Sequence, residues 1–259
     1  LPAFDGAIQA SSGMMSISGH PESGPTRTGY FSVDMSTALN AAFAISAALF
    51  RRHLTGEGQR VDVSMLDTAV VMQAAQMSNY LVNDTLPELM GNRSPTKSPT
   101  ANVFACSDGF VQIVALREPH VKGLFSLLGV ADLYERFPEP AIRIEHTDAI
   151  NAAIKPLLAA KPSQHWLDEL GQLGIPCAPI QTLDQVAAEP QFDHRLISTD
   201  IQNPRDAGKR SKVVSAGHIT EPAPPKVQRA TPRLGQDNDD IKERVINIFF
   251  KMPNYDINS

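Results

Sequence analysis

The sequence predicts an α/β fold in two parts, a first part with a helix, a strand and a helix in order, followed by a small α+β domain. Helical, extended and helical patterns follow one another over residues 35–82. Two short strand patterns flank an Asp-Gly turn at 108–109, and polar segments rich in Pro separate the patterned regions. With 259 residues, the chain is long enough to bury a substantial core.

One long helix dominates the first part. Residues 1–33 mix Gly with Ser, Thr and Pro, which predicts a loop around a short helix at 8–15. Residues 35–54 are rich in Ala, Leu and Phe and contain no Gly or Pro, so they predict a long helix. Basic residues in its last turn and Gly56 just beyond it are typical of a helix C-terminus. Asp34 therefore lies at the start of this helix.

An extended segment, a second helix and a long connector follow the first helix. Residues 59–65 alternate around two valines and predict a strand, whereas 66–82 return to a helical pattern. Residues 83–100 carry Pro and Gly among Ser, Thr and Asn, and a structureless connector of this length is unusual inside a compact domain. We expect it to cross between domains or to form a lid.

The second part has the pattern of a small α+β domain. The Asp-Gly pair favours a tight turn between two strands. We expect Ser163 to cap a helix, Trp166 to lie in the core, and the polar, Pro-rich stretch beyond 197 to span domains. The predicted strands cover 102–106, 110–115 and 177–180, and the predicted helices cover 121–128, 147–160, 163–173 and 237–249.

Charge and composition exclude several classes of function. The net charge is −5, and the basic residues at 209–212 form a short stretch that predicts a solvated turn rather than a nucleic-acid site. The apolar run at 38–50 is too short to span a bilayer, and no signal-peptide pattern opens the chain. Cys106 and Cys177 lack the spacing of a metal site or a disulfide framework. We expect buried thiols in a cytoplasmic enzyme that binds no metal, no nucleic acid and no membrane.

Several short motifs occur in the order in which one enzyme family carries them. The most specific is the Thr-Gly-Glu-Gly-Gln run at 55–59. The others are 4–6, 9–13, 16–19, Val33-Asp34, 91–99, Asp108-Gly109, Trp166 with 174–179, and 232–235. Together they resemble the class III, or CaiB/BaiF, CoA-transferase family, which includes formyl-CoA transferase and alpha-methylacyl-CoA racemase. The resemblance covers residues 1–241.

The resemblance implies an architecture that local patterns do not give. It implies a Rossmann-like large domain whose N-terminal part should precede residue 1 and is missing from this sequence. Residues 1–90 would be the C-terminal portion of the large CoA-binding domain with the catalytic Asp, 91–200 the small α+β domain, and 201–259 a linker and return to the large domain. Long linkers of this kind imply an interlocked homodimer. Residues 249–259 differ from the usual family ending.

The resemblance also implies a reaction. Asp34 matches the catalytic Asp of the family, and a carboxylate can attack a thioester, hold the acyl group as a mixed anhydride and then carry CoA as an enzyme thioester. Acyl-CoA and a carboxylic acid acceptor would be the substrates, with no permanently bound cofactor. From its pattern alone, Asp34 is an N-cap of its helix.

Further residues are candidates for the same site. Asp5 matches an often acidic family position and could orient substrate or the carrier carboxylate, although an Asp before Gly is also a turn former. The backbone amides of Gly91, Asn92 and Arg93 are candidate donors to an oxyanion. The Arg93 side chain either contacts CoA phosphate or the acceptor carboxylate, or is solvated. His20 is a candidate substrate contact.

Phe4 bears on the type of chemistry. The resemblance implies that racemases of the family carry a His there, paired with the Asp to move a proton at the α carbon. Phe4 cannot exchange protons, which favours a transferase. Two roles are open for His20: a substitute base, or an ordinary loop histidine. A third reading, from a different class, is a noncatalytic fragment that needs a separate N-terminal half.

Overall fold

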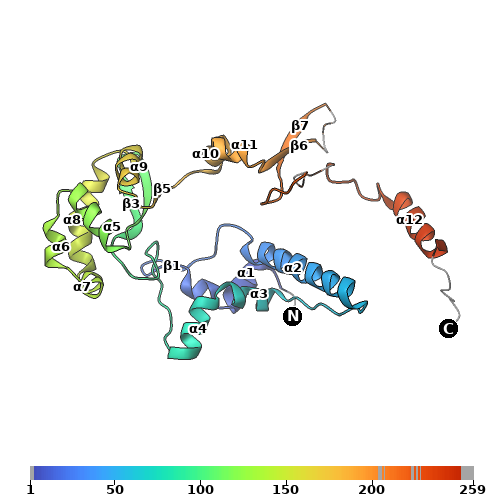
Figure 1. The fold of residues 1–259 in the computed structure, drawn as a ribbon, viewed down its shortest axis with the longest axis horizontal. Coiled ribbons are helices and arrows are strands. Elements are labelled where there is room, and N and C mark those ends of the chain that lie inside the picture. The colour runs from blue at the N-terminus through green and yellow to red at the C-terminus, as the bar shows by residue number, and fades with distance from the viewer. Residues whose placement is uncertain are drawn as a thin grey trace. The chain divides into compact units, whose positions relative to one another are not determined.

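The computed structural model describes residues 3–203, 206, 208–222, 225, 227 and 229–251. The chain divides into two compact units, Leu1–Ile180 and Gln181–Ser259. Figure 1 shows that the first unit has a helical part, in blue, and a mixed part of helices and strands, in green and yellow. The domain limits predicted from the sequence, 1–90, 91–200 and 201–259, stay a prediction.

The helical part is built around the long helix that the sequence predicts. This helix is α2 (Ser32–Thr55), and both α1 (Asp5–Ser11) and α3 (Met65–Met72) contact it (Figure 1). It ends as expected, at Gly56 in the left-handed region with φ 75°. The other elements are the 3₁₀ helix η1 (Met14–Ile17), the short strands β1 (Gly19–His20) and β2 (Gly24–Pro25), and α4 (Ala74–Asn83).

The strand predicted at 59–65 is wrong. Residues 57–64 form neither helix nor strand, and none of the described strands pairs with them. A strand exists only where a neighbour accepts and donates its backbone hydrogen bonds. The alternation around the two valines therefore could not produce a strand by itself.

Two helices are interrupted where the sequence predicts continuity. The helix expected at 8–15 is α1 followed by η1, because Gly13 adopts a left-handed conformation with φ 84° between them. The helix expected at 66–82 is broken at Gln73, which lies between α3 and α4. Its buried side chain donates to the carbonyl oxygens of Ser12 at 3.2 Å and of Ala69 at 2.9 Å. This tertiary contact holds the chain away from a straight helix.

α2 exposes most of its apolar side chains within this chain. Leu39 and Phe43 are 70% and 74% exposed. At 24 residues the helix is longer than the apolar run at 38–50, so the argument that this segment is too short to span a bilayer does not hold. Length and composition alone would let α2 cross a membrane, but a core helix of a globular protein passes the same test. The prediction of no membrane contact stays a prediction.

The mixed part of the first unit contains an antiparallel sheet with strand order β3-β4-β5. β3 (Ala101–Cys106) and β4 (Gly109–Val114) form the predicted hairpin, and β5 (Cys177–Pro179) pairs with β4. The helices are α5 (Glu118–Leu127), α6 (Asp132–Arg136), α7 (Pro140–Glu145), α8 (Thr147–Ala159) and α9 (Ser163–Gln172). They bury an apolar core that includes Phe104, Phe125, Ile150, Leu158 and, as predicted, Trp166.

The hairpin turn is tied to α9 by the Asp108 side chain. Its carboxylate accepts hydrogen bonds from the Ser163 backbone N–H at 2.7 Å and from the Ser163 hydroxyl at 3.1 Å. The prediction that Ser163 caps α9 is therefore wrong, because Ser163 is the first helical residue and its N–H is satisfied by Asp108. A cap that comes from 55 residues away leaves no local sequence signal.

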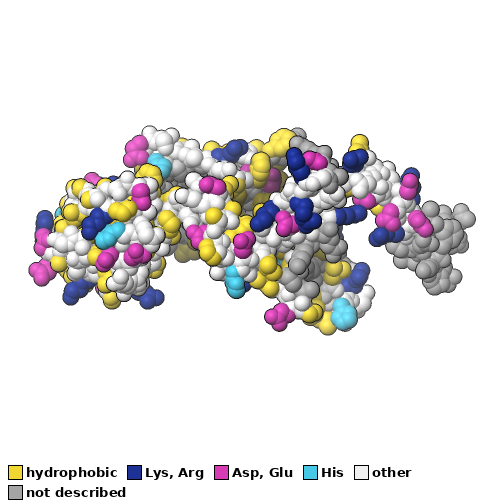
Figure 2. Space-filling view, turned by 90° about the horizontal axis from the view of Figure 1, so that it is seen from above, with side chains coloured by type: hydrophobic (Ala, Val, Ile, Leu, Met, Phe, Trp, Pro, Cys, Tyr) yellow, Lys and Arg dark blue, Asp and Glu magenta, His cyan; other side chains and the backbone are white. Residues whose placement is uncertain are grey.

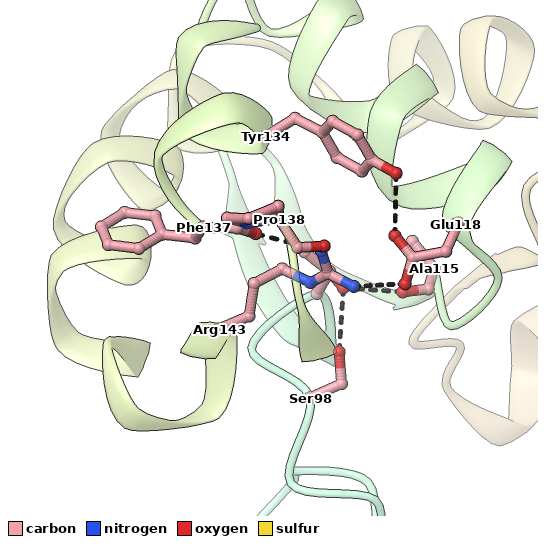
Figure 3. Close-up of polar contacts among 8 residues, drawn as sticks. Ser98, Ala115, Glu118, Tyr134, Phe137, Pro138 and Arg143 are labelled. Carbon is pink, nitrogen blue, oxygen red and sulfur yellow. Dashed lines mark hydrogen bonds and ion pairs between the residues drawn. The ribbon is translucent and has the colours of Figure 1, made fainter. Parts of the chain in front are cut away.

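A buried guanidinium connects α5 and α7 (Figure 3). The Arg143 side chain is only 3% exposed and forms an ion pair with Glu118. It also donates to the carbonyl oxygens of Phe137 at 3.1 Å and Pro138 at 2.7 Å, while the Tyr134 hydroxyl donates to Glu118 at 3.0 Å. Because a buried charge is tolerated only when it is paired and hydrogen-bonded, this cluster fixes the two helices against each other.

The cysteines lie in this sheet. Cys106 is buried, as predicted, whereas Cys177 is half-buried. Burial raises the pKa of both thiols, and the nearby Asp108 charge adds to the effect at Cys106. Both therefore stay protonated near neutral pH, which is the unreactive form of a thiol.

The second unit contains α10 (Leu183–Ala188), α11 (Pro190–His194) and α12 (Asn238–Lys251), with a hairpin of β6 (Ser198–Gln202) and β7 (Arg210–Val214). The helix α12 confirms the predicted C-terminal helix. The solvated turn expected at 209–212 is wrong, because 210–212 belong to β7 and pair with β6. The Pro-rich stretch at 221–225 and the C-terminal end lie partly outside the described residues.

Candidate active site

Asp34 lies in the first turn of α2 with an exposed side chain. Phe31 occupies the N-cap position, so the interpretation of Asp34 as the N-cap of this helix is wrong. Among the described residues, the Asp34 carboxylate has no hydrogen-bond or ion-pair partner. An unpartnered carboxylate at the positive end of a helix is free to react with a bound substrate.

Asp5 provides the acceptor for the start of α2. It is the first residue of α1 and is only 4% exposed. Its Oδ2 accepts the backbone N–H groups of Val33 at 2.8 Å and Asp34 at 3.1 Å, and its Oδ1 accepts Gln9 Nε2 at 2.6 Å. The turn-former interpretation of Asp5 is therefore wrong. Burial alone would raise the pKa of Asp5, but these hydrogen bonds, with the nearby Arg27 charge, hold it below its ordinary value.

The hydrogen bonds continue from Asp5 through Gln9 to Thr28. Gln9 is fully buried; its Nε2 also donates to Thr28 Oγ1 at 2.9 Å, and its Oε1 accepts the Thr28 N–H at 3.0 Å. Thr28 Oγ1 lies 3.0 Å from Ser32 Oγ. The network therefore starts at the α2 amides and returns to the first residue of the same helix.

The lowered pKa of Asp5 predicts how stability depends on pH. The unfolded chain takes up a proton near the ordinary Asp value of 3.8, before the folded protein does. The stabilisation from Asp5 is then full above about pH 5 and is lost as the pH falls toward the lower folded pKa. We expect Asp5→Asn to lower the free energy of unfolding by about 1–3 kcal/mol at pH 7 and by clearly less at pH 3.5, measured by urea denaturation.

The matched control for this experiment is Asp34→Asn. It removes an exposed carboxylate beside the same amides, and we expect it to change the free energy of unfolding at pH 7 by less than about 1 kcal/mol. An Asp5→Asn effect of the same size at both pH values would contradict the assigned origin of the stabilisation.

A close glycine contact joins the β1 hairpin to the loop at 91–93. The Gly91 N–H donates to the Gly19 carbonyl oxygen at 2.8 Å. Gly91 has φ 61°, and a Cβ at this position would collide with the His20 ring, so the approach requires glycine. The structure thus brings the candidate residues His20, Gly91, Asn92 and Arg93 into one region.

Two cavities adjoin the loop at 91–93. One, of 370 Å³, is lined by this loop, His20 in the β1 hairpin, and Asn151 and Lys155 on α8. The other, of 340 Å³, is lined by the same loop and by α4. Asp34 lines neither cavity. The described residues therefore gather the candidate binding residues but do not place the candidate nucleophile among them.

The 370 Å³ cavity is lined by basic and acidic side chains. Asn151 also lines it, but the Asn151 Oδ1 atom is buried away from the open space, without a partner among the described residues. Arg93 donates from Nε to a backbone carbonyl oxygen at 3.3 Å, and within the described part of the chain neither Arg93 nor Lys155 forms an ion pair. Glu22 and Asp148 also line the cavity. Such a mixed lining suits an anionic ligand that also carries hydrogen-bond donors.

The loop amides are less available than the sequence led us to expect. The Gly91 N–H is bonded to Gly19, and the Arg93 N–H donates to the Met90 carbonyl oxygen at 3.2 Å. Of the three candidate amides, only that of Asn92 lacks a partner among the described residues. Asn92 therefore remains the one candidate donor to an oxyanion in this loop.

Sequence reasoning missed Gln9, Thr28, Asn151 and Lys155. Asp5 and Gln9 lie four residues apart, as do Asn151 and Lys155, and this helical spacing was a usable signal. Thr28 had none, because its partner lies 19 residues away. No group of three or more His, Cys, Asp or Glu side chains that could hold a metal ion occurs within the described ranges.

The region from α1 to β7 corresponds to a known family. The sequence profile of CoA-transferase family III matches residues 1–238. The chain belongs to this family. The match spans every candidate residue of this family III chain and confirms the resemblance that the short motifs indicated.

Relatives of this family III chain include proteins named as CoA-transferases. It is 28% identical over 235 residues to the succinate–glutarate CoA-transferase of Agrobacterium fabrum, covering 90% of this chain and 58% of that protein. It is 31% identical over 240 residues to the succinyl-CoA:mesaconate CoA-transferase of Haloarcula marismortui, with coverages of 93% and 60%. The chain therefore spans less than two thirds of the length of these relatives.

A solved structure supports the fold. The crystal structure of a CaiB/BaiF family protein from Brucella suis matches with a TM-score of 0.79 and 28% sequence identity. The match covers 94% of this chain and 63% of that one. This family III chain therefore has the mixed helix and strand fold of CaiB/BaiF proteins.

Proposed function

We propose that the protein is an acyl-CoA:carboxylate CoA-transferase with Asp34 as its nucleophile. The observation that carries the proposal is the exposed, unpartnered Asp34 carboxylate in the first turn of α2. Relatives named for transfer to glutarate or mesaconate support the reaction class. Acyl-CoA and a carboxylic acid are the proposed substrates, and no permanently bound cofactor is required.

The proposed reaction proceeds by four acyl substitutions. The Asp34 carboxylate attacks the thioester carbonyl, and CoA leaves as thiolate, giving a mixed anhydride. The thiolate attacks the aspartyl carbonyl, which releases the donor acid and forms an Asp34–CoA thioester. The acceptor carboxylate then displaces the thiolate to give a second anhydride. Attack of the thiolate on the acceptor acyl carbonyl yields the new acyl-CoA and restores the Asp34 carboxylate.

The helix terminus alone cannot supply the required stabilisation. A charge at a helix N-terminus gains about 0.3–1 kcal/mol. An oriented donor to the developing oxyanion contributes about 2.7–4 kcal/mol. The amides of Val33 and Asp34 are held by Asp5, so they are unavailable for this task. We assign the donor role to the Asn92 N–H, because it is the amide of the 91–93 loop that has no partner among the described residues.

The 370 Å³ cavity is the proposed binding site for the anionic groups of the substrates. Arg93 and Lys155 would pair with phosphate or carboxylate. His20 lines the same cavity and packs on Gly91. We therefore assign His20 to substrate contact rather than to proton transfer.

The exposed apolar side chains of α2 support a larger assembly. Figure 2 shows hydrophobic side chains reaching the surface among interspersed charges. Exposed apolar side chains on this scale mark contact surfaces. An interlocked homodimer with a Rossmann-like large domain, in the cytoplasm, is the arrangement we propose. A monomer at all concentrations in sedimentation velocity would contradict the dimer.

The experiment that tests the function is thioester exchange with defined probes. The purified protein is incubated with succinyl-CoA and glutarate in D₂O. The thioesters are separated by liquid chromatography, and their masses are measured by mass spectrometry. We expect glutaryl-CoA to form without deuterium at the α carbon. Arg93→Gln should raise the KM for succinyl-CoA by about 10-fold, because one charge-assisted contact is lost.

Other outcomes of this assay favour other functions. Deuterium incorporation in the absence of glutarate would indicate the racemase chemistry, which the exposed Phe4 side chain disfavours. Neither exchange nor deuterium incorporation, together with no heat of CoA binding in calorimetry, would indicate a noncatalytic fragment. Glu57→Gln is the control for Arg93→Gln. It removes the exposed ion pair between Glu57 and Arg51 and should leave the KM for succinyl-CoA unchanged.

A further inference from the structure

We infer that Asp5, with Gln9 as its partner, is a positioning residue that fixes the Asp34 carboxylate for attack. The inference rests on the proposed role of Asp34 as nucleophile. Asp5 is buried and does not offer its carboxylate to a substrate: both oxygens are occupied by groups of the protein. Its contribution to the reaction is therefore made through Asp34.

The first step of the argument is the contact at the backbone of Asp34 itself. One oxygen, Asp5 Oδ2, accepts two consecutive N–H groups, those of Val33 at 2.8 Å and Asp34 at 3.1 Å. Two donors on one acceptor define both the distance and the direction of the first turn of α2 relative to α1. The Cα–Cβ direction of Asp34 is set by the same peptide groups, which fixes the point from which its carboxylate reaches a bound substrate.

The second step concerns the freedom of the Asp34 carboxylate. Asp34 is the third helical residue, where an acidic side chain commonly folds back to bond free amides at the helix start. Asp5 already occupies the amides of Val33 and Asp34. Among the described residues, the Asp34 carboxylate stays exposed and unpartnered. Asp5 thus satisfies two amides of the first turn that would otherwise be free to bond the Asp34 carboxylate.

The third step is the directionality of the network behind Asp5. Gln9 donates from Nε2 to Asp5 Oδ1 at 2.6 Å, and its Oε1 is committed to the Thr28 N–H at 3.0 Å. Gln9 is fully buried, so its amide has no solvent to replace a lost partner. An Asn at position 5 has one oxygen and one NH₂ group. If the NH₂ group faces Gln9 Nε2, two donors meet there. If it faces the α2 amides, two donors meet at that end instead, so one hydrogen bond is lost in either orientation.

This directionality permits a test that separates hydrogen bonding from fold. Asp5→Asn breaks the network. Asp5→Asn combined with Gln9→Glu restores the bond between positions 5 and 9 and the bond from the Thr28 N–H, with the charge moved to position 9 and the Thr28 hydroxyl turned from the Tyr30 carbonyl oxygen to donate to the carboxylate at position 9. With succinyl-CoA and glutarate, we expect Asp5→Asn to lower kcat by about 10–100-fold with KM changed by less than about threefold, as for a misoriented reacting group. The combined variant should recover kcat to within about fivefold of the parent.

A second readout follows the nucleophile directly. The rate of CoA adduct formation at Asp34, measured by quenched-flow mass spectrometry of the peptide, should fall with kcat in Asp5→Asn and recover in the combined variant. A purely structural role predicts instead fewer folded molecules, with kcat per folded molecule and the adduct rate unchanged; that result would overturn the inference. If Asp5→Asn does not fold, Thr28→Val, which loosens Gln9, should still lower the adduct rate by about threefold or more.

Failure of the inference and failure of the proposed function give different results. If Asp34→Ala retains exchange, Asp34 is not the nucleophile, and both are overturned. If Asp34→Ala is inactive while Asp5→Asn and Thr28→Val keep the parent kcat and adduct rate, only the positioning role of Asp5 is overturned. Recovery of kcat in the combined variant, together with inactivity of Asp34→Ala, supports both.

Discussion

Asp34→Asn is expected to lower the rate of CoA transfer from succinyl-CoA to glutarate by at least about 10³-fold, because removal of a nucleophile eliminates covalent catalysis. An amide keeps the size and polarity of the side chain but cannot form the anhydride. Since the Asp34 carboxylate is exposed and has no partner within the described residues, the substitution should leave the fold intact. The measurement is kcat by chromatographic detection of glutaryl-CoA, with the melting temperature recorded in parallel.

Asp67→Asn is the matched control for this prediction. Asp67 is also an exposed acidic residue at the third position of a helix, α3, but it lies outside the candidate site. We expect its substitution to leave kcat within about twofold of the parent.

Asp34→Asn should also abolish the CoA adduct on the peptide that contains residue 34. A CoA adduct on another peptide of Asp34→Asn, together with retained thioester exchange, would contradict the assignment of Asp34 as the nucleophile.

Glu118→Ala is expected to lower the free energy of unfolding by about 2–3 kcal/mol, the largest stability effect we predict for one side chain. The Arg143 guanidinium is 3% exposed and would lose its carboxylate partner while remaining buried (Figure 3). The two carbonyl oxygens that it contacts cannot neutralise its charge. The estimate is below that for a fully buried pair because the Glu118 side chain is 42% exposed. Urea denaturation monitored by circular dichroism measures the change.

The control for this pair is Asp132→Ala. Asp132 and Arg136 form an ion pair in which both side chains are more than half exposed, so we expect a loss of less than about 1 kcal/mol. A double-mutant cycle with Arg143→Met separates the ion pair from its neighbours. Glu118→Ala/Arg143→Met should be less destabilised than the sum of the single variants. Strict additivity would show that the pair contributes nothing by itself.

The fold was predictable where local chemistry decides it. The helix α2 follows from a Gly- and Pro-free run closed by Gly56, and the β3-β4 hairpin follows from the Asp-Gly turn. The strand expected at 59–65 failed because a strand needs a partner, and the valine alternation carries no information about one. The prediction of a continuous helix at 66–82 failed for a related reason. The helix is broken at Gln73, whose side chain bonds to a carbonyl oxygen 61 residues away.

The candidate site was predictable in part. The position of Asp34 near the start of α2 follows from the helix pattern, and its proposed chemistry follows from the ordered family motifs. The contact between His20 and Gly91 could not be predicted, because it depends on the approach of two loops distant in sequence. The loss of the Gly91 and Arg93 amides as donors depends on the same packing.

The sequence by itself determined that this chain belongs to CoA-transferase family III and carries a carboxylate near the start of a long helix. Only the tertiary structure decided what surrounds that carboxylate. The amides beside Asp34 could have been capped by its own side chain, by water or by another residue, and local pattern does not distinguish these. Packing of α1 against α2 brings the buried Asp5 within 3.1 Å of the Asp34 amide. A buried acceptor that meets two free donors is stabilising, so Asp5 takes the cap and Asp34 stays free.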